Sequence, residues 1–215
     1  YYLPKPPVAS LLMKAMKIVK PTTMLTVPMI IEKVYKGSVL PTIQKSRTLT
    51  WMNKHMNGLM CRIIGMKLKK TFGGCITFYG IGGAKLDPEV EAFLLKAKFP
   101  YAIGYGLTET APLLGYAMHG WRGVGVMGYP VYNVQLKLHN VNPETGEGEI
   151  IAKGPNVMLG YYKDPARTKS VFTEDGWFRT GDIAVQDEKG RFYIKGRNSN
   201  MILGPSGENI YPEEI

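Results

Sequence analysis

The 215 residues include 27 Lys and Arg against 17 Asp and Glu, so the formal net charge is +10 at pH 7. Hydrophobic residues make up 45% and aromatic residues 11%, which suffices for a core and excludes an intrinsically disordered or collagen-like chain. Two cysteines, Cys61 and Cys75, exclude a disulfide framework and a zinc site built from cysteine pairs, so we expect a reducing compartment.

The positive charge is concentrated at the start of the chain. Residues 1–70 contain 13 Lys or Arg and one acid, Glu32, a net charge of +12, whereas the remainder is slightly acidic. Because the basic residues are interleaved with Met, Ile and Leu, the pattern favours a solvated face or a contact to acidic parts of a parent protein. A binding module for nucleic acid or an anionic membrane is the alternative.

The first half of the chain predicts alternating strands and helices. Residues 9–20 place apolar residues and three lysines at helical spacing, which predicts a basic amphipathic helix that covers a core edge or contacts a membrane peripherally. The further predicted elements are a strand over 22–27, a helix over 28–36 ended by Gly37, a helix over 49–70 interrupted by Gly58 and Gly65, a strand over 75–79, a helix over 87–98 and a strand over 101–104. This order predicts a parallel α/β sheet, in which residues 80–84 and 104–110 share one crevice beyond the strand ends.

After about residue 120 the pattern changes to short strands and polar turns. Strands are expected over 134–138, 147–154, 183–187 and 191–196, with a hairpin turn at 187–190 and a short helix over 164–172. The predicted fold is α/β, a parallel-sheet layer followed by a small β-rich subdomain. Both ends suggest a piece of a longer protein, since the chain starts at Tyr1 and stops at what looks like the first turn of a helix, residues 211–215.

Three motifs contain residues suited to nucleotide chemistry. Residues 105–110 (YGLTET) combine a stacking ring, glycine, hydroxyls and a carboxylate suited to Mg²⁺, although Thr108 capping a turn and Tyr105 packing in a core is the structural alternative. Asp182 can accept hydrogen bonds from two vicinal ribose hydroxyls, or is simply a turn residue. Arg197 follows 15 residues later, and the hairpin between them predicts that both side chains lie at the same end.

Together these motifs resemble the adenylate-forming superfamily of acyl-CoA synthetases, peptide adenylation domains and luciferases, most closely the long-chain fatty-acid–CoA ligases. The matching segments are residues 20–37, 82–86, 105–110, 148–165, 176–182 and 196–215. The resemblance implies a partial adenylate-forming fold, with the later part of a large N-terminal domain over 1–120, a β-rich subdomain over 121–195, and a hinge with the start of a C-terminal domain over 196–215.

The resemblance also implies roles for individual residues. Thr108 and Glu109 would be catalytic, Thr108 holding the α-phosphate of ATP and Glu109 the magnesium ion. The other nucleotide-binding residues would be Gly82, Gly83, Ala84, Tyr105, Gly106, Leu107, Asp182, Ile194 and Arg197. Ser199 stands at the hinge, where relatives usually have Asp or Lys, and Gly207, Glu208 and Asn209 match the loop used in thioester formation.

The implied reaction joins a fatty acid to ATP, giving acyl-AMP and pyrophosphate, and coenzyme A then displaces AMP. ATP, Mg²⁺ and coenzyme A are the expected ligands, an amino or aryl acid is the alternative substrate, and no nucleic acid is expected. The family's phosphate loop and adenylation lysine are absent from these 215 residues, so we expect the isolated chain to be inactive and the parent to be cytoplasmic, with peripheral membrane contact through residues 9–20.

Overall fold

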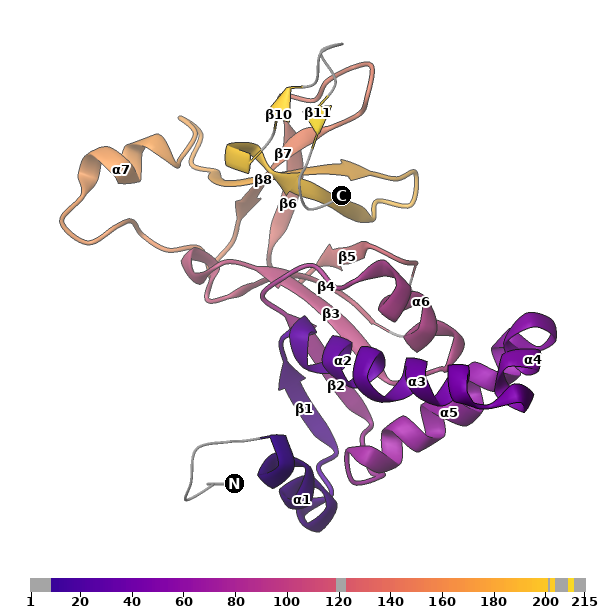
Figure 1. Cartoon of the computed structure of the whole chain (residues 1–215). Helices are drawn as coiled ribbons and strands as arrows, with labels where there is room; N and C mark the ends of the chain where they lie inside the picture. The colour runs from indigo at the N-terminus through magenta and orange to yellow at the C-terminus, as the bar shows by residue number, and fades with distance from the viewer. Residues whose placement is uncertain (1–8, 119–122, 201, 204–208, 211–215) are drawn as a thin grey trace. The chain divides into compact units, whose positions relative to one another are not determined.

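The computed structural model describes residues 9–118, 123–200, 202–203 and 209–210 (Figure 1). The chain forms two compact units, residues 1–102 and 103–215, each of which is described by itself. The domain boundaries expected at residues 120 and 195 stay predictions.

The first unit combines helices with parallel strands. Its elements are α1 (Ala9–Val19), β1 (Thr23–Thr26), α2 (Pro28–Val34), a π-helical turn η1 (Tyr35–Val39), α3 (Leu40–Lys45), α4 (Arg47–His55), α5 (Asn57–Thr71), β2 (Phe78–Gly82), α6 (Pro88–Lys96) and the start of β3 (Tyr101–Gly106). β1 and β2 pair in parallel, as predicted, with Thr23 opposite Phe78. Figure 1 shows α4 and α5 folding back on each other.

Local sequence explains where α6 begins and what it covers. Asp87 caps its first turn by accepting a hydrogen bond from the Glu89 amide at 2.9 Å, and Pro88 occupies the first helical position. The helix buries Val90, Phe93 and Leu94. The aromatic core of this unit is formed by the rings of Phe72, Tyr79 and Phe99, which pack against one another.

Three sequence expectations for this unit were wrong in detail. The helix that starts at Pro28 does not end at Gly37, because a π-helical turn, closed by the Leu40 amide on the Tyr35 carbonyl, continues it into α3. Pro41 explains the wider turn, since proline supplies no amide for the carbonyl of Gly37. The predicted strand over 75–79 is displaced to 78–82, because its register is set by pairing with β1.

The third correction concerns the glycines expected to interrupt the helix over 49–70. The break between α4 and α5 falls at Met56, and both Gly58 and Gly65 lie inside α5. Gly65 is required there for packing, since a Cβ atom at this position would come within 2.7 Å of the Ala97 Cβ atom. No helix in the described ranges has both the length and the hydropathy needed to span a bilayer.

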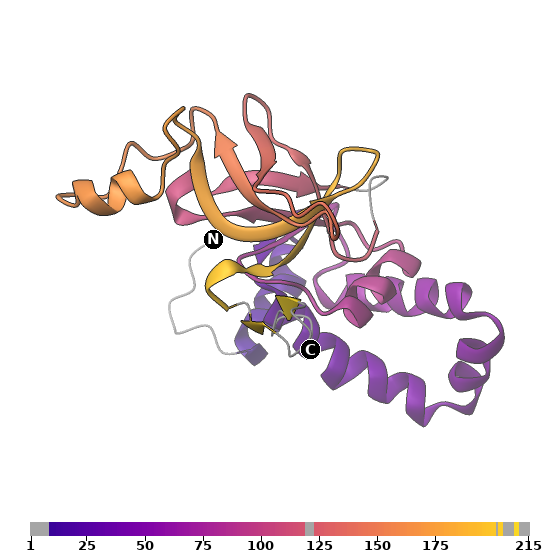
Figure 2. The same cartoon turned by 90° about the horizontal axis from the view of Figure 1, so that it is seen from above.

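The second unit is built from antiparallel strands. Its elements are β3, a 3₁₀ turn η2 (Thr108–Thr110), β4 (Leu113–Ala117), β5 (Val126–Pro130), β6 (Gln135–His139), β7 (Gly148–Lys153), α7 (Pro165–Ser170), β8 (Phe178–Gln186), β9 (Phe192–Arg197), a 3₁₀ turn η3 (Asn198–Asn200), β10 (Ile202–Leu203) and β11 (Asn209–Ile210). The hydrogen-bonded order is β3-β4-β5-β9-β8-β7-β6. α7 lies in the long connection between β7 and β8, away from the strands of this unit (Figure 2).

Most strands of this unit follow the alternating pattern of the sequence, but β4 and β5 were not predicted. The 187–190 turn is confirmed: the Gly190 amide bonds to the Asp187 carbonyl, and the Arg191 amide bonds to the Asp187 side chain. One core cluster contains Met127, Ile150, Ala184 and Phe192, and Tyr105 and Ile194 pack against it.

Candidate functional site

Three motif residues meet through their side chains in the second unit. The Tyr105 hydroxyl, on β3, donates a hydrogen bond to Oδ2 of Asp182 on β8 at 2.7 Å. The Arg197 Nε atom, on β9, lies 3.1 Å from Oδ1 of the same carboxylate. Asp182 and Arg197 face each other directly in the β8–β9 register, so both side chains lie at the same end of the hairpin, as predicted.

Burial and the neighbouring polar groups shift the pKa of this carboxylate in opposite directions. Burial raises the pKa of Asp182 above its ordinary value, while the hydrogen bond from Tyr105 and the charge of Arg197 oppose that rise. Burial, followed by the negative charge of Asp182, raises the pKa of Tyr105 well above its usual range, so its hydroxyl remains a donor. Arg197 is half exposed, so a cation borders the carboxylate on the solvent side.

Asp182 lies inside β8 and not in a separate turn; a second acid holds the irregular stretch of β8 at Gly181 that presents Asp182, called the Gly181 turn below. Glu149, buried at the start of β7, accepts two hydrogen bonds from Arg179 at 3.0 and 2.8 Å and a third from the Gly181 amide at 3.1 Å. Gly181 has φ +75°, a conformation that favours glycine. The Thr180 hydroxyl accepts a hydrogen bond from the Asp182 amide and donates one to the Ile150 carbonyl, so the turn is fixed from both sides.

Within the turn after β3, the Thr110 side chain bonds to the backbone on both sides. The buried Thr110 hydroxyl bonds to the Leu107 amide at 3.0 Å and donates to the Pro112 carbonyl at 2.7 Å. Gly106 has a structural reason to be glycine, because the Pro112 carbonyl oxygen lies 1.7 Å from where a Cβ atom would stand. Leu107 is partly buried and packs against the cluster of Leu114, Val134 and Ala152.

Thr108 and Glu109 of this turn differ in their surroundings. Thr108 is exposed, and its hydroxyl has no hydrogen-bond partner among the described residues. Glu109 is partly buried and accepts a hydrogen bond at Oε1 from the Tyr161 hydroxyl at 2.9 Å.

The described side chains suit a magnesium ion only if the ion arrives bound to a nucleotide. No group of three or more His, Cys, Asp or Glu side chains within the described ranges could hold a metal by itself. A single carboxylate such as Glu109 does suit Mg²⁺ that arrives with a nucleotide, because that ion is typically held by one or two carboxylates plus substrate phosphates and water.

The other predicted residues lie in the first unit, near the end of the second unit, or outside the described residues. Gly82, Gly83 and Ala84 belong to the first unit, at the end of β2, so the shared crevice stays a prediction. Ser199 is exposed in η3, and Asn209 begins β11, opposite Leu203. Gly207 and Glu208 lie outside the described residues.

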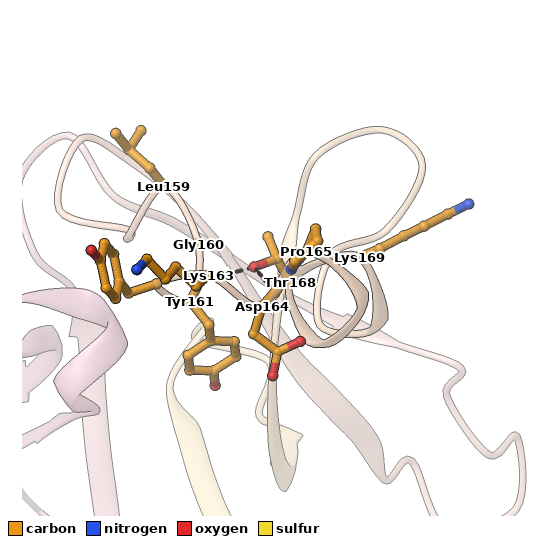
Figure 3. A pocket seen from close by; sticks show the side chains of 9 residues that line it. Leu159, Gly160, Tyr161, Lys163, Asp164, Pro165, Thr168 and Lys169 are labelled. Carbon is orange, nitrogen blue, oxygen red and sulfur yellow. Dashed lines mark hydrogen bonds between the residues drawn. The ribbon is translucent and has the colours of Figure 1, made fainter.

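An open hollow of about 560 Å³ lies along residues 159–169, which form the end of the loop after β7 and most of α7 (Figure 3). Its walls come from one local segment, and the sequence analysis placed no site residue there. Sequence reasoning also missed Tyr161, which bonds to Glu109, and Glu149 and Asn156, which bond to residues next to Asp182 and Glu109. All three lie in the 148–165 match to the superfamily, which was the available signal.

Comparison with known proteins identifies the family from sequence and the same fold from solved structures. The AMP-binding enzyme family matches residues 1–162. Long-chain-fatty-acid–CoA ligase 4 of Saccharomyces cerevisiae is 33% identical over 91% of the chain, which spans 30% of that ligase. ATP-bound MatB of Rhodopseudomonas palustris superposes with a TM-score of 0.71, at 27% identity, over 99% of the chain and 37% of MatB. O-succinylbenzoate coenzyme A synthetase of Bacillus subtilis, with ATP and magnesium, gives a TM-score of 0.69 at 23% identity over 96% of the chain and 38% of that protein.

Proposed function

The chain belongs to the AMP-binding enzyme family, and from that membership we propose that it is the nucleotide-binding part of an ATP-dependent acyl-CoA ligase. The resemblance to adenylate-forming enzymes and the α/β fold class are both confirmed by the comparisons. The chain spans about a third of the length of these relatives, so the activity proposed is that of a longer protein.

The contact of Tyr105, Asp182 and Arg197 supports nucleotide binding most directly. A carboxylate with two oxygens can accept hydrogen bonds from both hydroxyls of a ribose, and it must be ionised and fixed to do so. Tyr105 and Arg197 hold it in place from two strands, and Ile194 packs on the same core cluster as Tyr105. We assign Asp182 to the ribose, Tyr105 to the adenine face, and Arg197 to the sugar beside its phosphate.

Thr108 and Glu109 are assigned to the phosphate end. The Thr108 hydroxyl, which bonds to none of the residues that the structure describes, is available as a donor to the α-phosphate, and Glu109 is the carboxylate for the metal. Bound Mg²⁺ would neutralise charge on the phosphates while a substrate carboxylate attacks the α-phosphorus and pyrophosphate leaves. The chain's own contribution is to orient the nucleotide, which accounts for much of catalysis in phosphoryl-type transfers. Coenzyme A would then accept the acyl group.

We favour a long-chain fatty acid as the substrate because the yeast ligase is similar over most of the chain. An aromatic or amino acid substrate is the alternative, since the Bacillus synthetase shares the fold. Gly82, Gly83 and Ala84 are assigned to the adenine and carboxylate end, Ser199 to the hinge, and residues 207–209 to thioester formation. A cytoplasmic location, membrane contact through residues 9–20 and inactivity of the isolated chain stay predictions.

Nucleotide binding is tested first on the 215-residue chain, by calorimetric titration with AMP. We expect weak binding that Asp182→Asn abolishes and that Glu188→Gln, which removes an exposed charge, leaves unchanged. Equal AMP affinity in the wild type and in Asp182→Asn would refute the assignment of this site.

Activity is tested on the full-length protein that contains these residues, by pyrophosphate release. With ATP and coenzyme A, palmitate is expected to give faster turnover than benzoate or phenylalanine. A preference for either of the other acids would replace the fatty-acid substrate but keep the ligase. Robust turnover by the 215 residues alone would contradict the predicted inactivity of the isolated chain.

A further inference from the structure

Residues 156–161, here called the clamp segment, bind the turn that bears Glu109 at three places. The Asn156 side-chain amide donates to the carbonyls of Thr110 and Leu113, both at 2.8 Å. The Met158 amide donates to the Glu109 carbonyl at 2.8 Å. The Tyr161 hydroxyl donates to Oε1 of Glu109 at 2.9 Å. The clamp segment therefore fixes both the backbone of Glu109 and one oxygen of its carboxylate.

Tyr161 is itself held by the start of α7. Its amide donates to the Thr168 hydroxyl at 2.9 Å, drawn as a dashed line in Figure 3, and that hydroxyl donates to the Asp164 carbonyl at 2.8 Å. The Arg167 guanidinium lies over the Tyr161 ring, 4.2 Å from its centroid. These contacts restrict the ring through a backbone bond and a cation–π contact, so the hydroxyl is directed at Glu109 before any ligand binds.

The chemistry of the contact leaves one carboxylate oxygen available. Oε1 accepts the hydrogen bond from the Tyr161 hydroxyl, whereas Oε2 has no hydrogen-bond partner within the described ranges. A glutamate without such a contact would sample several rotamers, and ordering it would cost conformational entropy when a metal binds.

We propose that Tyr161 is a positioning residue that orients the Glu109 carboxylate so that Oε2 receives the Mg²⁺ ion accompanying ATP. The inference rests on the proposed function and adds to it a residue outside the predicted site. Groups that hydrogen-bond to metal-ligating carboxylates tune metal affinity without touching the ion. Tyr161 touches neither substrate nor metal, and its effect is confined to the metal-dependent part of nucleotide binding.

The test compares Tyr161→Phe with Tyr162→Phe in the full-length protein. Tyr162 is the next residue, its side chain is 88% exposed, and the same hydroxyl is removed. The probes are AMP, whose binding needs no metal, and a non-hydrolysable ATP analogue titrated with MgCl₂. Tyr161→Phe is expected to bind AMP as the wild type does, but to need about tenfold more Mg²⁺ for half-maximal binding of the analogue. Tyr162→Phe is expected to match the wild type with both probes.

A second variant tests the support of the ring. Arg167→Gln removes the guanidinium over Tyr161 and is expected to shift the Mg²⁺ requirement in the same direction, by about twofold to fivefold. An unchanged Mg²⁺ requirement in Tyr161→Phe overturns the inference, and so does a parallel loss of AMP and analogue binding, which indicates a general structural role. Absence of AMP binding in the wild type instead overturns the proposed function, which keeps the two failures distinct.

Discussion

The Tyr105 hydroxyl lies 2.7 Å from Oδ2 of Asp182, although 77 residues separate the two in the chain. The bond joins β3 to β8, which are not neighbours in the strand order of the second unit. Both residues come from motifs that suggest nucleotide binding but that each have a structural explanation on their own. Their contact means that the proposed stacking ring of Tyr105 and the proposed ribose acceptor Asp182 hold each other in position.

The buried Asp182 carboxylate is expected to reduce the stability of the unliganded chain at neutral pH. Because burial raises the folded-state pKa above 3.8, the folded state holds its proton to a higher pH than the unfolded chain does. Stability conferred by the protonated form is thus present below 3.8 and lost as the pH rises through the folded-state pKa. Urea unfolding between pH 3 and 7 should show that the free energy of unfolding of Asp182→Asn increases relative to that of the wild type as the pH rises. A difference that is independent of pH would contradict this.

Asn156 is expected to stabilise the turn that bears Glu109. Asn156→Ala leaves the Thr110 and Leu113 carbonyls without their donor, which should cost about 1–3 kcal/mol. Asn156→Asp should cost more, because it points a carboxylate at two carbonyl oxygens. Urea unfolding at pH 7 measures both free energies. An Asp variant as stable as the Ala variant would mean that the two hydrogen bonds are not formed in solution.

Two glycines of α5 should respond to alanine in opposite directions. Gly58→Ala should stabilise the chain by up to about 1 kcal/mol, because no atom lies within 4 Å of the added Cβ and alanine favours helix. Gly65→Ala should destabilise it by about 1–3 kcal/mol, because the new Cβ meets the Cβ and the carbonyl oxygen of Ala97. Thermal unfolding of the pair checks this. Stabilisation by both substitutions would show that α5 and Ala97 are not in contact.

Glu149 is expected to link stability to nucleotide affinity. Glu149→Gln removes the charge that Arg179 and the Gly181 amide share, which should cost about 1–2 kcal/mol, since Arg179 is partly solvated. AMP affinity should fall as well, because the Gly181 turn, which presents Asp182, loosens. Calorimetric titration and urea unfolding measure the two effects. Full AMP affinity in a destabilised variant would mean that the Gly181 turn is held without Glu149.

Several elements were predictable because their signals are local. Asp87 and Pro88 predict the start of α6, and four consecutive residues predict the 187–190 turn. The alternating pattern over 134–138 and 191–196 predicts two strands without a structure. The hairpin register followed from that turn, and so the placement of Asp182 and Arg197 at the same end of the hairpin was predictable. The continuation of the helix past Gly37 and the break at Met56 were not predictable, because the first depends on a π-helical turn before Pro41 and the second falls at a residue that is not glycine.

The sequence alone determined the composition, the basic first third, the order of most strands and helices, and the motifs that place the chain in its family. The tertiary structure decided which side chains meet. Tyr161 and Glu109 are 52 residues apart, and Glu149 and Arg179 are 30 apart. Contacts over such separations depend on the strand order and on backbone hydrogen bonds formed elsewhere in the unit. No local periodicity or motif spacing encodes them.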